Sequence, residues 1–391
     1  MDRSASRRNF LAAGLALPAV ASATRSQDSP EKRPQPSSAP AGSPVFQYRT
    51  LGKTKLKVTT VGMGCMITSD GSVIEHAADM GITYFDTARS YQKGNNERMV
   101  GAALKRKRKD IVLSTKTEGK DKAEALEQLD TSLKELGTDY LDIWYLHAKD
   151  KPEAVSDDLI EAQQIAIKAG KVRHAGVSTH QREMVPFLAK HEKVEVILAN
   201  YNFTMVPEWT AAIEEAAKAG KGVVAMKVMA GGMGRGRGGA ANPNAERFKQ
   251  PGAMAAVYRW VTRNPNVHTT VPSMTDIEQV AENIRAGSQP FGQADAKLLA
   301  ERRELIRPYY CSVCGKCEGT CQQGLPVANM LRFVTYADGY GQFALGRERF
   351  LELSAEHMAV RCGDCAECTV QCPHGVHVVD QLTRAQDIFG C

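Results

Sequence analysis

The sequence predicts an α/β fold, in which a barrel of eight parallel strands alternating with helices is followed by a small α-helical domain. Four short apolar segments end at Asp86, Lys116, His147 and Ser178, in steps of about 30 residues, and each step contains a helical pattern. Repeated strand–helix units of this kind form a parallel sheet, and eight of them close into a TIM barrel. The composition changes after residue 310, where nine of the ten cysteines lie.

The composition is that of a globular protein. The chain has 391 residues, of which 43% are hydrophobic and 24% are charged, enough for one large core and an accessory domain. The net charge of +6 is too small to indicate a nucleic-acid partner. The basic run Lys105–Lys109 is better explained as the exposed carboxyl end of a helix, where cations favour the helix dipole. We do not expect an integral membrane protein.

The first 45 residues lie outside the predicted fold. Residues 6–11 read Ser-Arg-Arg-Asn-Phe-Leu, a twin-arginine motif, and a short apolar stretch leads to Ala21-Ser22-Ala23, which is typical of a cleavage site. A chance pair of arginines is the alternative. Residues 1–23 are therefore predicted to be a signal peptide read by the twin-arginine translocase, and residues 24–45, with five prolines, a disordered linker. The mature protein is expected to be periplasmic or otherwise extracytoplasmic.

The elements of the barrel follow from alternating and helical patterns. A hairpin over residues 48–58 precedes the strands, and in the order of the chain the eight strands are predicted at 61–64, 84–86, 111–116, 141–147, 174–178, 194–201, 223–228 and 268–271. Helices are expected from residue 95 into the basic run, over 122–136 and over 276–286. In the second of these, a stripe at helical spacing is predicted to face the core: Ala123, Leu126, Leu129, Leu133 and Leu136.

Three segments resemble the aldo-keto reductase family in order and spacing: Gly81–Tyr91, Leu113–Lys116 and Trp144–His147. The resemblance covers residues 46–290 and implies a TIM barrel, a nicotinamide cofactor and a tetrad of catalytic residues. In this chain those residues are Asp86, Tyr91, Lys116 and His147.

The chemistry of the four residue types agrees with that expectation. A carbonyl that receives hydride becomes an alkoxide and needs a proton, but a free tyrosine, with a pKa of about 10, is a poor acid at neutral pH. The Lys116 ammonium is expected to lower the pKa of Tyr91, Asp86 to hold Lys116, and His147 to orient the carbonyl. Each residue alone is also compatible with an ordinary structural role. The presence of all four at the ends of consecutive predicted strands favours a catalytic site.

The resemblance also places cofactor contacts. Gly64, Cys65 and Met66 are expected near the nicotinamide ribose. Ser178 matches the family's carboxamide contact, but Thr179 and Leu198 stand where Asn and Gln are usual. Because residues two apart on a strand share a face, Asn200 is predicted to supply the missing polar contact.

Later strands complete the predicted cofactor site. Met226 stands where the family stacks an aromatic ring on the nicotinamide, and Lys227 and Met229 lie in a glycine-rich stretch that could cradle pyrophosphate. The predicted adenosine contacts are Ser273, Thr275, Gln279, Glu282 and Asn283. NADP(H) is the expected cofactor, with NAD(H) as the alternative, because no Arg or Lys directly follows Thr275. The insert 231–250 is expected to be a mobile loop over the cofactor.

The C-terminal region, residues 291–391, carries two cysteine runs. They are Cys311, Cys314, Cys317, Cys321 and Cys362, Cys365, Cys368, Cys372. This is the spacing of bacterial ferredoxins, in which the fourth cysteine of each run ligates the other cluster. Two [4Fe–4S] clusters are predicted, one held by Cys311, Cys314, Cys317 and Cys372 and the other by Cys321, Cys362, Cys365 and Cys368. Zinc and disulfides are the alternatives.

The expected function is therefore hydride transfer between NADP(H) and a small carbonyl or alcohol, in a protein with two [4Fe–4S] clusters and a redox partner protein. Nicotinamide passes two electrons together whereas each cluster takes one, so the clusters could serve another route or stabilise the structure. Two other functions stay open. One is a nucleotide-bound redox sensor or regulatory subunit, and the other is an electron-transfer protein that uses the barrel as a scaffold.

Overall fold

The computed structural model describes residues 46–232 and 250–390. The predicted signal peptide and linker lie outside these residues, as do Cys391 and nearly all of the predicted mobile insert. Within the described residues, no helix combines the length and the apolar character needed to cross a membrane.

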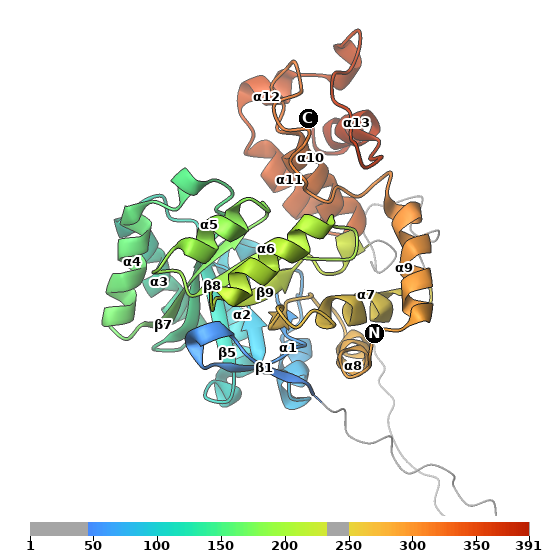
Figure 1. Cartoon of the computed structure of the whole chain (residues 1–391). Helices are drawn as coiled ribbons and strands as arrows, with labels where there is room; N and C mark the ends of the chain where they lie inside the picture. Colours follow the sequence, from blue (N-terminus) through green and yellow to red (C-terminus); the bar gives the residue numbers. More distant parts are fainter. Residues whose placement is uncertain (1–45, 233–249, 391) are drawn as a thin grey trace, which may run out of the picture. The chain divides into compact units, whose positions relative to one another are not determined.

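Eight parallel strands form one sheet in the order of the chain (Figure 1). The strands are β3 (Met63–Gly64), β4 (Tyr84–Asp86), β5 (Val112–Thr117), β6 (Leu141–Leu146), β7 (Val172–Thr179), β8 (Val196–Asn200), β9 (Gly222–Met226) and β10 (Thr269–Thr270). The two ends of the sheet meet through isolated bridges between Val61 and Thr270 and between Gly64 and Ser273. The sheet is thus a nearly closed barrel, and the predicted TIM-barrel fold is confirmed.

A hairpin of β1 (Tyr48–Thr50) and β2 (Lys57–Thr59) closes the amino end of the barrel. Its Leu51 and Val58 are fully buried in the apolar barrel interior. Gly52, at φ +53°, packs against the start of β9, where an added Cβ would lie 2.4 Å from the Gly222 nitrogen. Glycine is therefore required at this close approach.

Helices follow the strands: α1 (Gly71–Asp79), α2 (Asn95–Leu104), α3 (Lys122–Leu136), α4 (Asp157–Lys168), α5 (Met184–Lys190), α6 (Pro207–Lys218), α7 (Ala253–Thr262) and α8 (Ile277–Gly287). The predicted bounds of α3 are confirmed; the Asp121 side chain caps its start and Gly137, at φ +63°, ends it. The predicted apolar stripe is wrong at one position. Ala123 is exposed and Ala125 is buried, because the buried face of α3 begins a little further along the chain.

The C-terminal region is helical, with α9 (Gln293–Ile306), α10 (Val327–Val334), α11 (Phe343–Leu351), α12 (Ala355–Ala359) and α13 (Val378–Phe389). α9 packs on α7, where Arg259 donates to both oxygens of Asp295 at 2.9 and 2.5 Å, and its Leu299 and Ile306 join the core of the barrel. The sequence analysis counts α9 with the C-terminal region. The later helices have a separate apolar core, around which six of the eight clustered cysteines pack: Cys311, Cys317, Cys321, Cys362, Cys368 and Cys372. We call residues 307–390 the cysteine module.

Candidate active site and cysteine clusters

The four predicted catalytic residues come together at the carboxyl ends of neighbouring strands. Asp86 ends β4, Lys116 lies near the end of β5, and His147 directly follows β6. Tyr91 begins the short turn η2 (Tyr91–Gly94) after β4. Because parallel strands bring their carboxyl ends to one face of the barrel, residues about 30 apart in sequence become neighbours.

Asp86 and Lys116 form a buried ion pair. Their relative exposures are 3% and 2%, and Lys116 Nζ donates to Asp86 Oδ2 at 2.5 Å and to the Thr87 carbonyl at 2.6 Å. Ser114 Oγ donates to the other carboxylate oxygen of Asp86 at 2.7 Å. The pair thus fixes the Lys116 ammonium in place.

We expect Asp86→Asn to lower the free energy of unfolding by about 3–5 kcal/mol, because it leaves the Lys116 charge buried without its partner. Urea unfolding followed by circular dichroism measures the change. The control is Asp130→Asn, which breaks the exposed pair with Lys171 and should change little. An equal, small effect of both variants would contradict the proposed cost of the buried charge.

The environment of Tyr91 differs from the prediction. Lys116 Nζ lies 4.8 Å from the centre of the Tyr91 ring, but burial, followed by the negative charge of Asp86, raises the pKa of Tyr91 well above 10. Burial also lowers the pKa of Lys116, although Asp86 opposes this. The net pKa of Tyr91 is therefore raised, not lowered, because desolvation of the phenolate outweighs the effect predicted for the Lys116 ammonium.

His147 meets Tyr91 edge to face, with ring centres 5.8 Å apart and planes at 78°. Burial lowers the pKa of His147, which favours the neutral ring. Its Nδ1 lies 3.0 Å from Glu118 Oε1, a close electrostatic contact that is not aligned as a hydrogen bond. Burial would raise the pKa of Glu118, but His147, Arg349 and Ser90 outweigh it and lower that pKa to about 2. Arg349 belongs to the module, and its guanidinium lies 3.3 Å from Glu118.

The depressed pKa of Glu118 predicts a pH-dependent contribution to stability. Its folded pKa, about 2, lies below its ordinary value of 4.5, so the contribution is complete above pH 4.5 and is lost as the pH falls toward 2. We expect Glu118→Gln to lower Tm at neutral pH and the difference from wild type to shrink below pH 4.5. Thermal melts across that range measure it. A difference in Tm that is constant with pH would contradict the role of the Glu118 charge.

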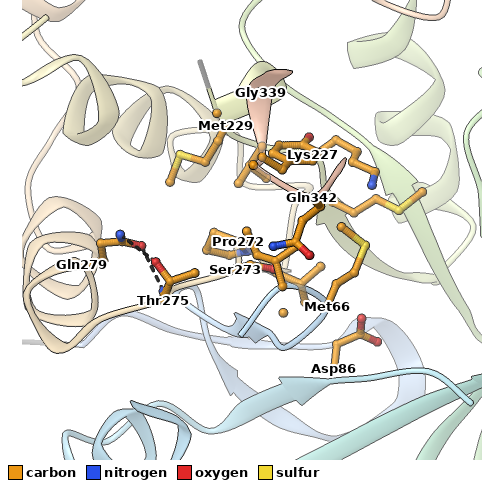
Figure 2. A pocket seen from close by; sticks show the side chains of 18 of the residues that line it. Met66, Asp86, Lys227, Met229, Pro272, Ser273, Thr275, Gln279, Gly339 and Gln342 are labelled. Carbon is orange, nitrogen blue, oxygen red and sulfur yellow. Dashed lines mark hydrogen bonds between the residues drawn. The ribbon is translucent and has the colours of Figure 1, made fainter. Parts of the chain in front are cut away.

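A cavity of about 300 Å³ opens beside the tetrad. Asp86 and Tyr91 line one part of it, and Figure 2 shows Thr275 and Gln279 on another side, joined by hydrogen bonds. Eight of the predicted cofactor residues line it: Gly64, Met66, Met226, Lys227, Met229, Ser273, Thr275 and Gln279.

Five predicted cofactor residues do not line this cavity: Cys65, Ser178, Asn200, Glu282 and Asn283. Cys65 is fully buried in the core, and Ser178 Oγ accepts a bond from the Ala148 nitrogen at 2.8 Å. Asn283 is fully buried, and its amide has no hydrogen-bond partner among the described residues.

Asn200 does not line the large cavity. Its Nδ2 donates to the His180 carbonyl at 3.0 Å, while its Oδ1 is buried without a partner in the described part of the chain. It lines a second, smaller cavity of about 20 Å³, whereas Leu198 lines the large one. The carboxamide contact by Asn200 stays a prediction; Asn200 lies two residues beyond Leu198 on β8.

The sequence analysis missed the part of the cavity wall that comes from the module. Residues Gly339, Tyr340, Gly341 and Gln342 line the large cavity. Gly339 ends a π-helical turn, η7 (Thr335–Gly339), which follows α10, and the other three residues come directly after it. Gly339 and Gly341 are the available signal, but nothing in the sequence places them against the loop at Gly231, more than 100 residues earlier in the chain.

The cysteines gather as two sets. A third cavity, of about 10 Å³, is lined by Cys311, Cys314, Cys317 and Cys372, so that three thiols of the first run face the last of the second. At Cys362, burial and then the neighbouring thiols Cys321, Cys368 and Cys365 raise the thiol pKa to about 11. The nine cysteines that the structure describes form no disulfide. No three Cys, His, Asp or Glu side chains within those residues lie close enough to hold a single metal ion.

The three cavities are neighbours. Lys227 and Tyr340 line both the large and the second cavity, and Cys311 lines both the second and the third. A chain of adjoining spaces therefore runs from the tetrad to the first set of cysteines.

A parallel barrel with its polar side chains at the carboxyl ends of the strands defines a TIM-barrel enzyme scaffold. In a comparison with known protein families, the model of the aldo/keto reductase family matches residues 69–304, well over half of the chain. The chain belongs to the aldo/keto reductase family.

Individual relatives are moderately similar. An uncharacterized oxidoreductase of Bacillus subtilis, YqkF, is 31% identical over 44% of this chain and 61% of its own length. A probable voltage-gated potassium channel subunit beta of Arabidopsis thaliana is 29% identical over 36% of this chain and 48% of its own. The chain thus spans about half to three-fifths of these curated relatives. The solved aldo-keto reductase AKR11C1 of Bacillus halodurans superposes with a TM-score of 0.55 at 26% identity, over 70% of this chain and 99% of that one.

Proposed function

We propose that this protein is an oxidoreductase that transfers hydride between NADP(H) and a small carbonyl or alcohol. The observation that carries the proposal is the buried Asp86–Lys116 pair, with Tyr91 and His147 beside it, at one side of a 300 Å³ cavity. The bound nicotinamide would supply the hydride. The chain would supply the proton, its placement and the charge that stabilises the product.

Tyr91 is the proposed acid. Its hydroxyl is protonated at neutral pH and can donate to a forming alkoxide, although burial raises its pKa and so weakens it as an acid. The Lys116 ammonium, 4.8 Å from the ring centre, offsets the negative charge left on Tyr91. Neutral His147 can donate a ring N–H to the carbonyl oxygen and orient it.

The residues fit a dinucleotide. The lining contains a cation, Lys227, suited to pyrophosphate, and apolar Met226 against which a nicotinamide ring can pack. NADP(H) is proposed over NAD(H) from the family resemblance, and competition between the two nucleotides tests it.

Two [4Fe–4S] clusters are proposed for the module, on Cys311, Cys314, Cys317 and Cys372 and on Cys321, Cys362, Cys365 and Cys368. Three observations support the clusters. The first set of cysteines lines one small cavity, the thiols of the second set lie near one another, and apolar side chains pack around both sets. Two runs of three cysteines plus a fourth are the spacing of bacterial ferredoxins, whereas zinc sites usually pair two C-x2-C knuckles. The clusters would supply one-electron transfer to a partner protein.

Export by the twin-arginine route is proposed from residues 1–23, with the linker at 24–45, the barrel at 46–290 and the cysteine domain at 291–391. Replacing Arg7 and Arg8 by Lys should hold the protein in the cytoplasm, measured by fractionation. Unchanged export of that variant would contradict the proposal.

A second candidate function is a nucleotide-bound regulatory subunit. It is favoured by the similarity to a protein named as a potassium channel β subunit. Both candidates bind nicotinamide, but only the first turns over a carbonyl. The test is oxidation of NADPH by the full-length protein, purified without air, against a panel of aldehydes, ketones and quinones. Turnover of a carbonyl compound supports the reductase. Binding of nucleotide without turnover of any compound in the panel favours the regulatory subunit. If the protein binds no nucleotide, the remaining function is an electron-transfer protein that uses the barrel as a scaffold.

A further inference from the structure

The wall that the module contributes to the large cavity is a short, tightly built turn. Four of its residues line the cavity: Gly339, Tyr340, Gly341 and Gln342. Figure 2 shows the Gln342 side chain reaching into the space near Pro272, Ser273 and Met66, with Gly339 above it. We call residues 339–342 the strap.

The strap is held rigidly within the module. The Tyr340 nitrogen donates to the Thr335 carbonyl at 3.2 Å, and the Gln342 nitrogen donates to the Tyr336 carbonyl at 2.8 Å. Just before the strap, Asp338 accepts two hydrogen bonds from Arg384 of α13, at 2.5 and 2.7 Å. π-helical turns of this kind occur frequently at functional sites.

The strap meets the barrel backbone to backbone. A Cβ added to Gly339 would lie 2.0 Å from the Gly231 carbonyl oxygen, in the loop after β9. That atom belongs to the backbone and cannot swing aside, so only glycine permits this contact. The Gly231 and Gly232 pair predicted as a pyrophosphate cradle is thus largely covered by the module. The rings of Tyr336 and Tyr340 stack on each other, and their centres lie 4.9 and 5.5 Å from Lys227 Nζ.

Further polar contacts fasten the module to the carboxyl face of the barrel. Asn202 donates to the Tyr310 hydroxyl at 3.1 Å, and Arg349 reaches Glu118 at 3.3 Å. These contacts are spread over the loops after β5 and β8. The strap therefore cannot move away from the cavity without loosening a distributed interface.

We propose that the strap binds over the nicotinamide dinucleotide and retains it, so that the cofactor leaves only when the module undocks. The inference rests on the proposed function. The cavity joins the tetrad, at Asp86 and Tyr91, to the predicted adenosine contacts Thr275 and Gln279, and the strap forms a wall of the same space. Gln342 supplies a hydrogen-bonding amide from outside the 69–304 region that matches the family. If the protein is exported as proposed, retention would keep a nucleotide in the barrel where free NADPH is absent.

The test is the rate at which bound nucleotide leaves the full-length, cluster-loaded protein. NADPH is loaded, an excess of NADP⁺ is added as a trap, and loss of bound NADPH fluorescence is followed. We expect Gly339→Val to release NADPH at least about tenfold faster than wild type, since such changes act mainly on dissociation. Gln342→Ala and Arg384→Gln, which add no clashing atom, should give smaller increases. Gly292→Ala, where an added Cβ has nothing within 4 Å, is the matched control.

Iron content and visible absorbance are measured on every variant, so that loss of the module's fold is recognised. Faster release with unchanged iron in Gln342→Ala and Arg384→Gln supports the strap even where Gly339→Val does not fold. Equal release rates in wild type and in these two variants would overturn the strap while leaving the proposed function intact. Failure of the wild type to bind any nicotinamide nucleotide would instead overturn the proposed function, and the strap with it.

Discussion

Tyr91→Phe is expected to lower kcat for NADPH-dependent carbonyl reduction by roughly 10²–10⁴-fold, the usual contribution of a positioned general acid. The hydroxyl is the only atom removed, and the ring keeps its edge contact with His147. Nucleotide binding should be nearly unchanged, because the proposed role of the hydroxyl begins only when the alkoxide forms. Steady-state rates give the first quantity and fluorescence titration the second.

The control for Tyr91→Phe is Tyr48→Phe, which removes a hydroxyl from a half-exposed tyrosine of the hairpin at the other end of the barrel. That variant should match wild type. Because the pKa of Tyr91 lies well above 10, ionisation of this group should not reduce the wild-type rate at neutral or mildly alkaline pH. A Tyr91→Phe variant with an ordinary kcat would show that another group gives the proton.

The second large effect tests how the cysteine runs would share the two proposed [4Fe–4S] clusters. In the proposed arrangement, which we call crossed ligation, the fourth cysteine of each run binds the cluster of the other run. Cys311→Ser combined with Cys372→Ser then removes two ligands of the same cluster, and about four of the eight irons should remain. Cys311→Ser combined with Cys321→Ser removes a ligand from each cluster and should cost most of the iron. Iron analysis and the visible absorbance of protein prepared without air measure both outcomes.

The two double variants are each other's control, since each replaces Cys311 and the last cysteine of one of the two runs. The cavity lined by Cys311 and Cys372 together predicts the crossed result. If the variant with Cys311 and Cys321 replaced kept about half of its iron, and the variant with Cys311 and Cys372 replaced lost most of it, each run would hold its own cluster. Cys65→Ala, in the core of the barrel, should leave the iron unchanged.

Local patterns were sufficient for most of the barrel. The βα repeat near 30 residues identified the strands that end at Asp86 and Lys116, and a capping Asp121 with a terminating Gly137 fixed α3. The convergence of the tetrad follows from topology alone, because parallel strands align their carboxyl ends. The predicted core-facing stripe on α3 is wrong at Ala123, because helical spacing identifies the apolar face but not which turns of the helix are covered by neighbouring elements.

What the sequence did not predict lies where two distant parts of the chain meet. The pKa of Tyr91 depends on burial, and the cysteine module contributes nearby groups such as Tyr336 and Arg349, so no local pattern could give its direction. Asn200 was assigned to the nicotinamide from strand periodicity, but the module turns that position into the wall of a second cavity. The contact of Gly339 with Gly231 has no sequence signal beyond the two glycines.

The cavity shared by Cys311 and Cys372 also constrains the order of biosynthesis. Its walls come from both ends of the module, so the pocket does not exist until the ribosome has released nearly the whole chain. Iron–sulfur loading of this site would therefore follow translation, and the leader, although made first, would have to wait for it. If residues 1–23 are the proposed export signal, a product that ends before Cys372 would carry that signal without the complete first set of cysteines.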